Sequence, residues 1–230
     1  MFTQRRLSDR LPGFLASGGL VFACTLLMPI CAGAVDGIDQ IELPVVCRSD
    51  WKAAEPRAGL KRHKIRMITI HHSATVQRKN ENFSRRVRGF QSWHQNHLKF
   101  PDIAYHFLID SQGVVHQGRD PSFKVDTPTD YDPDGHLSIC LIGNFEVEQP
   151  DPRQLQSLYR LISWAGERYG VSLDHVKGHR DYAHTLCPGK NVYKLIHTGF
   201  LDKRLRDTQA GRRFRLKYSC TTSDSPVSEP

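Results

Sequence analysis

The sequence contains no internal repeat and no low-complexity linker. A chain of 230 residues without such boundaries is expected to form one domain with short extensions. Hydrophobic residues make up 39% and charged residues 24%, as in globular proteins, which excludes a collagen, a coiled coil and a membrane protein with several spans. The net charge is +8, but no aromatic-rich RNA-binding motif or recognition-helix pattern accompanies it. We therefore expect no nucleic-acid partner.

The first 34 residues have the composition of an export signal. Three arginines within the first ten residues precede a largely apolar stretch over 13–32, and Ala32-Gly33-Ala34 matches a small-residue cleavage site. We expect a signal peptide at 1–34 and an exported protein, periplasmic or secreted, with no stable membrane span after cleavage. The alternative is an uncleaved anchor, because the apolar stretch approaches the ~20 residues that cross a bilayer.

The route of export stays open. Arg5-Arg6 also occurs in twin-arginine signals, although the residues that follow fit poorly. Cys24 or Cys31 is a candidate for lipidation, although the residues before each match a lipidation signal poorly.

The rest of the chain divides into three parts. Residues 35–46 show no clear hydrophobic periodicity and are predicted to be a leader. Residues 47–205 are predicted to be the folded domain. Residues 206–230 are charged and then rich in Ser, Thr and Pro, which predicts a flexible C-terminal tail. Within the domain, apolar strand signals and amphipathic helix patterns alternate. Strands are predicted at 67–70, 103–110, 114–117 and 137–145, helices at 83–98, 151–169 and 192–200, and a long surface loop at 118–135.

Three side chains predict a metal site. His71 follows the apolar strand 67–70, where sheet proteins often place functional residues, and His179 and Cys187 share one polar loop. Two imidazoles and a thiolate with a free fourth position are the arrangement of catalytic zinc, which activates water and polarises a carbonyl. Two alternatives stay open. Cys187 could form a disulfide, and His184 as a fourth ligand would make the zinc structural.

Five motifs occur in order along the domain. They are His71-His72-Ser73-Ala74-Thr75, Asp102-Ile103-Ala104-Tyr105-His106-Phe107, Gln117-Gly118-Arg119, Ile142-Gly143-Asn144-Phe145, and a segment from Gly178-His179-Arg180-Asp181 to Thr185-Leu186-Cys187-Pro188-Gly189. In this order they resemble the type-2 N-acetylmuramoyl-L-alanine amidases, which include the phage amidase lysozymes and the peptidoglycan recognition proteins. Arg48-Ser49-Asp50-Trp51 adds a match near the start of the domain, and the resemblance covers roughly residues 46–200.

The resemblance implies an α/β fold, a single domain with a central mixed β-sheet flanked by helices and a zinc site at the strand ends. It implies that His71, His179 and Cys187 hold Zn²⁺, in agreement with the trio chosen on chemical grounds. It implies an exported zinc amidase that hydrolyses the amide bond between N-acetylmuramic acid and L-alanine in peptidoglycan or muropeptides. Recognition members that bind without cutting usually lack the Cys ligand, so Cys187 favours hydrolysis. The alternative is a non-catalytic module that binds peptidoglycan in the same groove.

Other roles follow from the same resemblance. The catalytic tyrosine corresponds to Tyr105, expected to donate to the water or the developing oxyanion, and Thr185 is expected to position the carbonyl. The alternatives are a packed sheet tyrosine and a turn residue. His72, His94 and Arg119 are expected to contact substrate, although His116-Gln117 before Gly118-Arg119 departs from the usual Tyr-Glu. His72 should face away from the metal because neighbours on a strand point to opposite faces. Trp93 is expected in the core.

Four cysteines follow the predicted signal peptide. With Cys187 on zinc and Cys140 buried in an apolar strand, Cys47 and Cys220 remain, either free or paired. A Cys47–Cys220 disulfide would tie together the two ends of the domain, and domain ends often lie near each other. The positive charge favours an anionic polymer of the cell envelope as the partner.

Overall fold

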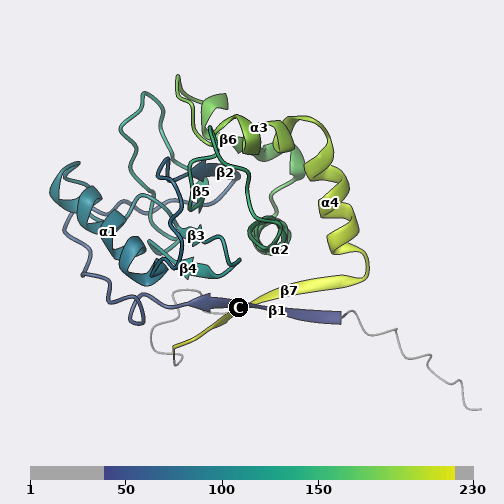
Figure 1. Ribbon diagram of the computed structural model, residues 1–230, viewed down its shortest axis with the longest axis horizontal. Coiled ribbons are helices and arrows are strands. Elements are labelled where there is room, and N and C mark those ends of the chain that lie inside the picture. Colours follow the sequence, from purple (N-terminus) through teal and green to yellow (C-terminus); the bar gives the residue numbers. More distant parts are fainter. Residues whose placement is uncertain (1–38, 221–230) are drawn as a thin grey trace, which may run out of the picture. The chain divides into compact units, whose positions relative to one another are not determined.

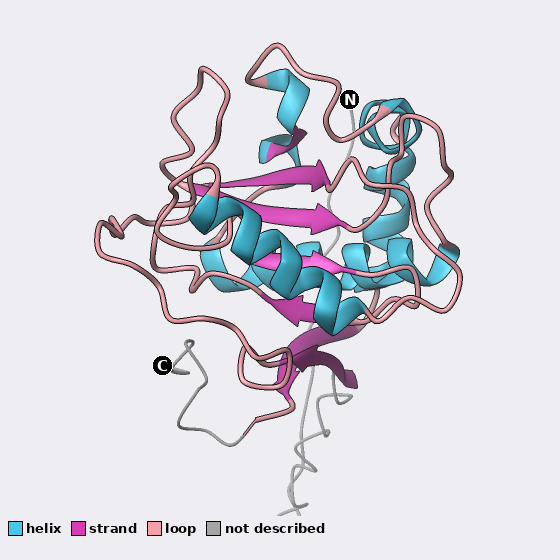
Figure 2. Ribbon diagram, turned by 60° about the vertical axis from the view of Figure 1, so that its left-hand side comes forward, coloured by secondary structure: helices cyan, strands magenta, loops and turns pink. Residues whose placement is uncertain are grey.

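The structure is a computed structural model that describes residues 39–220. The predicted signal peptide at 1–34 lies outside these residues. A seven-stranded sheet runs in the order β6-β2-β5-β3-β4-β1-β7 (Figures 1 and 2). The strands are β1 Asp39–Val46, β2 Met67–His72, β3 Phe107–Ile109, β4 Val115–Gln117, β5 His136–Leu141, β6 Val176–Gly178 and β7 Arg212–Tyr218. The β3–β4 pair is antiparallel and the other neighbours are parallel, which confirms the predicted mixed sheet.

Helices cover both faces of the sheet (Figure 1). They are α1 Phe83–Asn96, α2 Pro152–Tyr169, α3 Lys190–His197 and α4 Phe200–Gln209, with short 3₁₀ turns at Leu173–His175 and His179–Asp181. The main apolar core lies between the sheet and α2, α3 and α4, and a smaller core lies under α1. Within residues 39–220, no helix is both long enough and apolar enough to cross a membrane.

Local signals set the ends of the two longest helices. Asn82 caps α1 by accepting a hydrogen bond from the Arg85 N–H at 2.9 Å. Asp151 caps α2, and Pro152 occupies the first turn, where its missing N–H is not needed. Gly170 ends α2 with a φ of 68°, which a residue with a Cβ rarely adopts. Both helices therefore begin within a residue of their predicted starts.

The structure corrects the predicted ends of the domain. Residues 39–46 form β1, although a leader was predicted at 35–46. A flexible tail was predicted at 206–230, but α4 continues to residue 209 and residues 212–218 form β7. The two strands pair in parallel over seven residues. Each buries alternate apolar residues, such as Leu43 in β1 and Phe214 and Leu216 in β7. These apolar side chains belong to the main core, while the residues between them are largely exposed.

Three further predictions need correction. The predicted strand at 137–145 ends at Leu141, and the predicted helix at 192–200 is replaced by α3 and the start of α4. Trp93 is not in the core, because 54% of its surface is exposed and its ring stacks on His97 with centroids 3.9 Å apart.

A disulfide joins Cys47 and Cys220, the paired one of the two alternatives that the sequence left open. The two residues are 173 apart in sequence, and they follow the paired strands β1 and β7. The Cys220 N–H lies 3.1 Å from the Cys47 sulfur, and the Cys47 N–H donates to the Ser219 hydroxyl at 3.0 Å. The bridge therefore locks the edge of the sheet where the first and last described strands meet.

Replacing Cys47 and Cys220 together by Ala should lower the free energy of unfolding by about 2–5 kcal/mol, because the cross-link restricts the unfolded chain. Urea denaturation with and without reductant measures this, and reduced wild type should match the variant. Oxidised, denatured protein that begins at residue 35 should show the two free thiols of Cys140 and Cys187. Four titratable thiols in that sample would contradict the bridge.

Buried histidines should make the fold sensitive to acid. The His106 Nδ1 accepts the Ser138 N–H at 2.8 Å, its Nε2 lies 3.0 Å from the Phe123 carbonyl, and burial lowers its pKa to about 3. The unfolded chain binds this proton near pH 6.5. Stability should therefore be fully present above pH 6.5 and fall as the pH decreases towards 3, by about 1.4 kcal/mol per pH unit for each such histidine.

Urea denaturation at pH 7.5, 6.0 and 5.0 tests this expectation. Burial also lowers the pKa of His94 and His136 to about 4, which acts in the same direction. A His106→Asn variant should show a shallower dependence of unfolding free energy on pH than wild type. Equal slopes for the two proteins would show that His106 does not contribute.

Candidate metal centre

The end of β2 presents two histidines to opposite faces of the sheet. His71 pairs with Cys140 of β5, whose side chain belongs to the core under α1. His72 pairs with Leu141, which belongs to the main core on the other face. The His72 Nδ1 accepts the Phe145 N–H at 3.2 Å. The prediction that His72 turns away from the metal ligands agrees with this geometry, and its predicted contact with a substrate stays a prediction.

The neighbouring strand brings a second imidazole to His71. Gly178 at the end of β6 pairs with Ile70, so the next residue, His179, lies beside His71 with ring centroids 4.7 Å apart. Gly178 is required by close packing, because a Cβ there would lie 2.9 Å from the Pro188 ring. The loop that follows turns back, and the Arg180 N–H donates to the Cys187 carbonyl at 2.9 Å.

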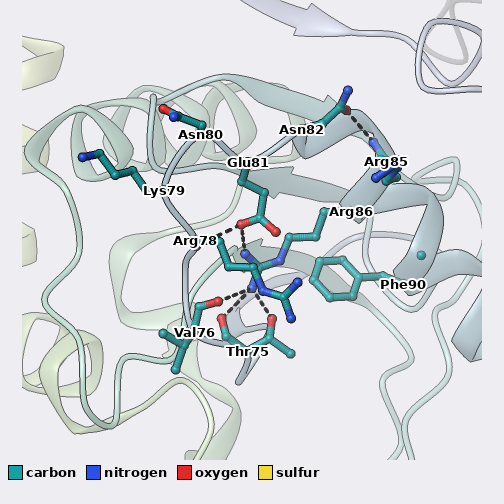
Figure 3. A pocket seen from close by; sticks show the side chains of 11 residues that line it. Thr75, Val76, Arg78, Lys79, Asn80, Glu81, Asn82, Arg85, Arg86 and Phe90 are labelled. Carbon is teal, nitrogen blue, oxygen red and sulfur yellow. Dashed lines mark hydrogen bonds and ion pairs between the residues drawn. The ribbon is translucent and has the colours of Figure 1, made fainter.

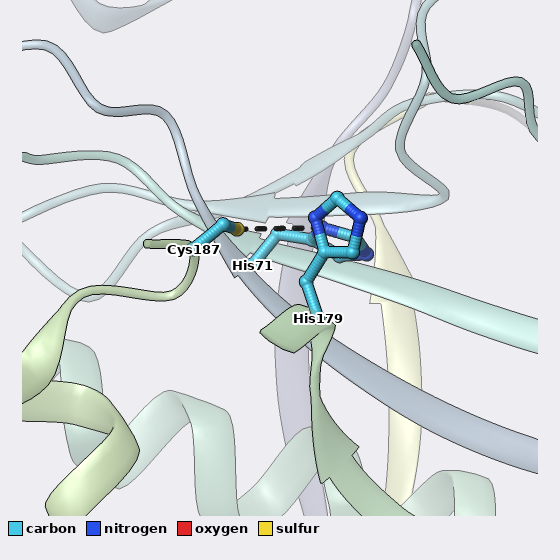
Figure 4. A group of neighbouring side chains, drawn as sticks. All are labelled: His71, His179 and Cys187. Carbon is cyan, nitrogen blue, oxygen red and sulfur yellow. Dashed lines mark hydrogen bonds between the residues drawn. The ribbon is translucent and has the colours of Figure 1, made fainter. Parts of the chain in front are cut away.

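This turn completes the predicted trio (Figure 4). The Cys187 sulfur lies 3.6 Å from the His71 Nδ1, and one donor atom from each of His71, His179 and Cys187 lies within 4.8 Å of the others. His184, the alternative fourth ligand, does not belong to this group, and Cys187 is a free thiol. The structure therefore brings together three donors from two parts of the chain more than 100 residues apart.

The donor set suits zinc. Burial, and then the nearby His179, lower the pKa of His71 well below its ordinary value, and burial lowers that of His179 to about 4. Both imidazoles are therefore neutral at pH 7 and have a lone pair to offer. The buried His71 Nε2 has no hydrogen-bond partner among the described residues. Two neutral imidazoles and one sulfur form a set typical of a zinc site with a free position.

The thiol of Cys187 holds its proton until a cation arrives. Burial raises its pKa to about 12, and the His72 N–H, 3.4 Å from the sulfur, acts in the opposite direction. A coordinated thiol is deprotonated by the charge of the ion. Metal binding at this centre should therefore release a proton.

Tyr105 lies beside the centre on the same face as His71. Its ring centroid is 5.6 Å from that of His71 and 5.6 Å from that of His94. Burial, and then the neighbouring sulfurs of Cys140 and Cys187, raise the pKa of Tyr105 well above its ordinary value. Its hydroxyl therefore stays protonated and can act as a hydrogen-bond donor.

His94 and Thr185 support their neighbours directly. The buried His94 accepts the Ala104 N–H on Nδ1 at 3.1 Å, and its ring packs edge-on against Tyr105. The Thr185 hydroxyl accepts the Cys187 N–H at 3.2 Å and so shapes the loop that carries the thiol. Contacts of His94 and Thr185 with a substrate stay predictions.

Arg119 is not available to a substrate, which corrects the predicted contact. Only 1% of its surface is exposed. Its guanidinium donates to the carbonyls of Asp102, Ile103 and Lys124 and pairs with Asp126 at 2.8 Å. Its backbone N–H donates to the Tyr105 carbonyl at 2.8 Å. Arg119 is thus part of the scaffold that holds the Tyr105 segment.

The sequence did not indicate two residues that contact His179. The Thr129 hydroxyl lies 2.8 Å from the His179 Nε2, and the Tyr131 ring centroid lies 5.1 Å from that of His179. Both come from the long polar loop predicted at 118–135. This loop has no hydrophobic periodicity, so its sequence does not indicate which of its side chains will contact a strand end 50 residues away.

A separate hollow of about 920 Å³ lies between the β2–α1 loop and the first turns of α1 (Figure 3). None of the three donors lines it. Arg86 forms one wall, where its guanidinium pairs with Glu81 and donates to the carbonyls of Thr75 and Val76. Gly89 also lines the hollow, and a Cβ at this position would meet nothing within 4 Å.

The chain is similar to known proteins in sequence and in fold. The family described as N-acetylmuramoyl-L-alanine amidase matches residues 61–190, which include all three donors. The chain belongs to this family. Peptidoglycan recognition protein 1 of Mus musculus is 31% identical over 183 residues, 78% of this chain and 97% of that protein.

Two solved structures have the same fold. Drosophila peptidoglycan recognition protein SD is 30% identical with a TM-score of 0.62, over 68% of this chain and 94% of that one. Human PGRP-IBETAC, in complex with glycosamyl muramyl pentapeptide, is 28% identical with a TM-score of 0.60, over 67% of this chain and 94% of that one. The predicted family and α/β fold are thereby confirmed.

Replacing His71, His179 or Cys187 by Ala should abolish stoichiometric zinc binding, because each leaves only two donors at the centre. Elemental analysis after gel filtration in buffer with micromolar zinc measures the bound metal. His97→Ala is the matched control, since His97 is an exposed histidine stacked on Trp93. One equivalent of zinc retained by all three ligand variants would refute the assignment of this centre.

Proposed function

We propose that the protein is an exported, zinc-dependent N-acetylmuramoyl-L-alanine amidase that cleaves the amide bond between N-acetylmuramic acid and L-alanine in peptidoglycan. The observation that carries the proposal is the complete trio of His71, His179 and Cys187 beside the Tyr105 ring. Three protein donors leave a position for water or a carbonyl oxygen, as catalytic zinc sites do. Membership of the amidase family supports the same reaction.

The residues divide the work between holding the ion and assisting the reaction. Zinc, when bound, would supply a Lewis acid that polarises the amide carbonyl and lowers the pKa of a water molecule. His71 and His179 remain neutral and offer lone pairs, and Cys187 gives up its proton. Tyr105 keeps its proton and would donate a hydrogen bond to the oxygen that gains negative charge during attack. His94, which packs against the Tyr105 ring, keeps that ring in place.

The substrate and compartment follow from separate observations. The human relative was solved with a muramyl pentapeptide, which supports a muropeptide or peptidoglycan as the ligand of this chain. The Cys47–Cys220 disulfide suits an oxidising compartment, in agreement with the predicted signal peptide at 1–34. We therefore place the protein in the periplasm or outside the cell.

Recognition without hydrolysis is the second candidate. It is favoured by the names of the relatives, which are peptidoglycan recognition proteins. Both functions need a ligand-binding groove, but only hydrolysis needs the metal centre and a proton donor beside it. Digestion products therefore separate the two.

Zinc-loaded protein should release stem peptides with a free L-alanine amino group from purified peptidoglycan, as shown by mass analysis of the soluble products. Tyr105→Phe should lower kcat by about 10²–10³-fold, because one donor to the developing oxyanion is lost. Its zinc content and its binding to sacculi should stay at the wild-type level. Wild-type protein that holds zinc and binds sacculi but releases no peptide would establish a recognition module.

A further inference from the structure

The segment 126–134 crosses beside the metal centre, and we refer to it as the strap. It belongs to the long loop between β4 and β5. Three ion pairs join acidic residues of the strap to basic residues, two of which, Arg119 and Lys124, belong to the same loop. They are Asp126 with Arg119 at 2.8 Å, Asp132 with Lys124 at 2.8 Å, and Asp134 with Arg66 at 2.7 Å. The pair with the buried Arg119 anchors the start of the strap, whereas the other two pairs lie at the surface and contribute little.

Two threonines of the strap form a chain of hydrogen bonds to a metal ligand. The Thr129 hydroxyl lies 2.8 Å from the His179 Nε2 and 2.7 Å from the Thr127 hydroxyl. The Thr129 N–H also donates to the Thr127 hydroxyl oxygen, at 3.2 Å. The Thr127 hydroxyl oxygen can accept a second hydrogen bond and is therefore available to the Thr129 hydroxyl proton.

The direction of this chain corresponds to the tautomer of His179, because the two hydroxyls can donate either way. The Thr129 hydroxyl has a single proton to donate, and Thr127 offers it an acceptor. Thr129 then accepts from the His179 Nε2–H, and a neutral imidazole with its proton on Nε2 has its lone pair on Nδ1. The reverse direction would place the proton on Nδ1 and leave no lone pair for an ion.

Aromatic packing limits rotation of the same ring. The Tyr131 ring centroid is 5.1 Å from that of His179, and Tyr131 stacks on Tyr182 with centroids 5.7 Å apart. His71 lies at 4.7 Å from His179. The imidazole of His179 is therefore enclosed by rings and fixed at Nε2 by a hydroxyl.

We propose that Thr129 is a positioning residue of the metal centre: its hydroxyl accepts from the His179 Nε2–H, so that Nδ1 faces the ion. The inference rests on the proposed function only in requiring a metal ion at the trio. Histidine ligands in metalloproteins commonly donate their other N–H to an outer partner, and loss of that partner costs about 10–100-fold in metal affinity. Here the partner comes from the strap, so the loop takes part in building the centre.

The test compares zinc affinity among threonine variants by competition with a chromophoric chelator. Thr129→Val removes the hydroxyl at nearly constant volume, and we expect the zinc dissociation constant to rise about 10–100-fold. Thr129→Ser should restore wild-type affinity. Thr208→Val is the matched control, since the Thr208 hydroxyl bonds to the Arg204 carbonyl within α4. It should bind zinc as wild type does.

A second measurement reads the tautomer directly. Nitrogen-15 NMR of zinc-free wild-type protein should show His179 protonated on Nε2, with the His179→Gln variant providing the assignment. This readout needs no folded Thr129→Val protein. A His179 protonated on Nδ1 would overturn the inference, as would wild-type zinc affinity in folded Thr129→Val.

The outcomes separate the inference from the proposed amidase function. If wild-type protein cleaves peptidoglycan but Thr129→Val binds zinc with unchanged affinity, the positioning role of Thr129 is ruled out and the proposed amidase function stands. If Thr129→Val binds zinc more weakly but wild-type protein does not cleave peptidoglycan, the amidase function is ruled out and the positioning role of Thr129 stands. Wild-type protein that binds no zinc removes both.

Discussion

The parallel pairing of β2 with β5 on one side and β6 on the other is the constraint on which the metal centre depends. It places His71 at one strand end and directs the chain that leaves β6 so that His179 lies beside it. Because side chains alternate along a strand, a slip of one residue would bring His72 to the face that now carries His71. His71 would then turn towards the main core, away from His179 and Cys187.

The two cores hold this register from opposite faces. Ile68 and Ile70 of β2 pack into the main core with α2. Both side chains would have to leave that core if the strand shifted by one residue. The smaller core under α1 supports the Tyr105 segment, together with the buried Arg119. Burying a guanidinium is costly unless it is paired and hydrogen-bonded. Asp126 and three backbone carbonyls meet that requirement, and the same Asp126 anchors the strap that carries Thr129.

What could be predicted from the sequence depended on how local the signal was. His71 follows a run of apolar residues, and Cys187 lies in the same loop as His179, so both positions were evident from neighbours along the chain. The pairing of β1 with β7 joins residues more than 170 apart, and neither strand is apolar enough to stand out alone. The burial of Arg119 and the contact of Thr129 with His179 likewise depend on partners far away in sequence. Trp93 was misplaced because it follows the helical spacing of the buried residues but lies at the edge of that face.

The charge of the donor set bears on which function the centre would serve. No carboxylate belongs to the trio, and burial keeps the sulfur of Cys187 protonated and the imidazoles neutral before an ion binds. A divalent ion with one thiolate would leave a net charge of about +1, whereas four cysteines would leave about −2. A positive centre in a partly buried site attracts a carbonyl oxygen and favours hydroxide over water. A protonated Tyr105 adds a donor for negative charge on the same side, so the electrostatics favour an oxyanion and hence hydrolysis over recognition alone.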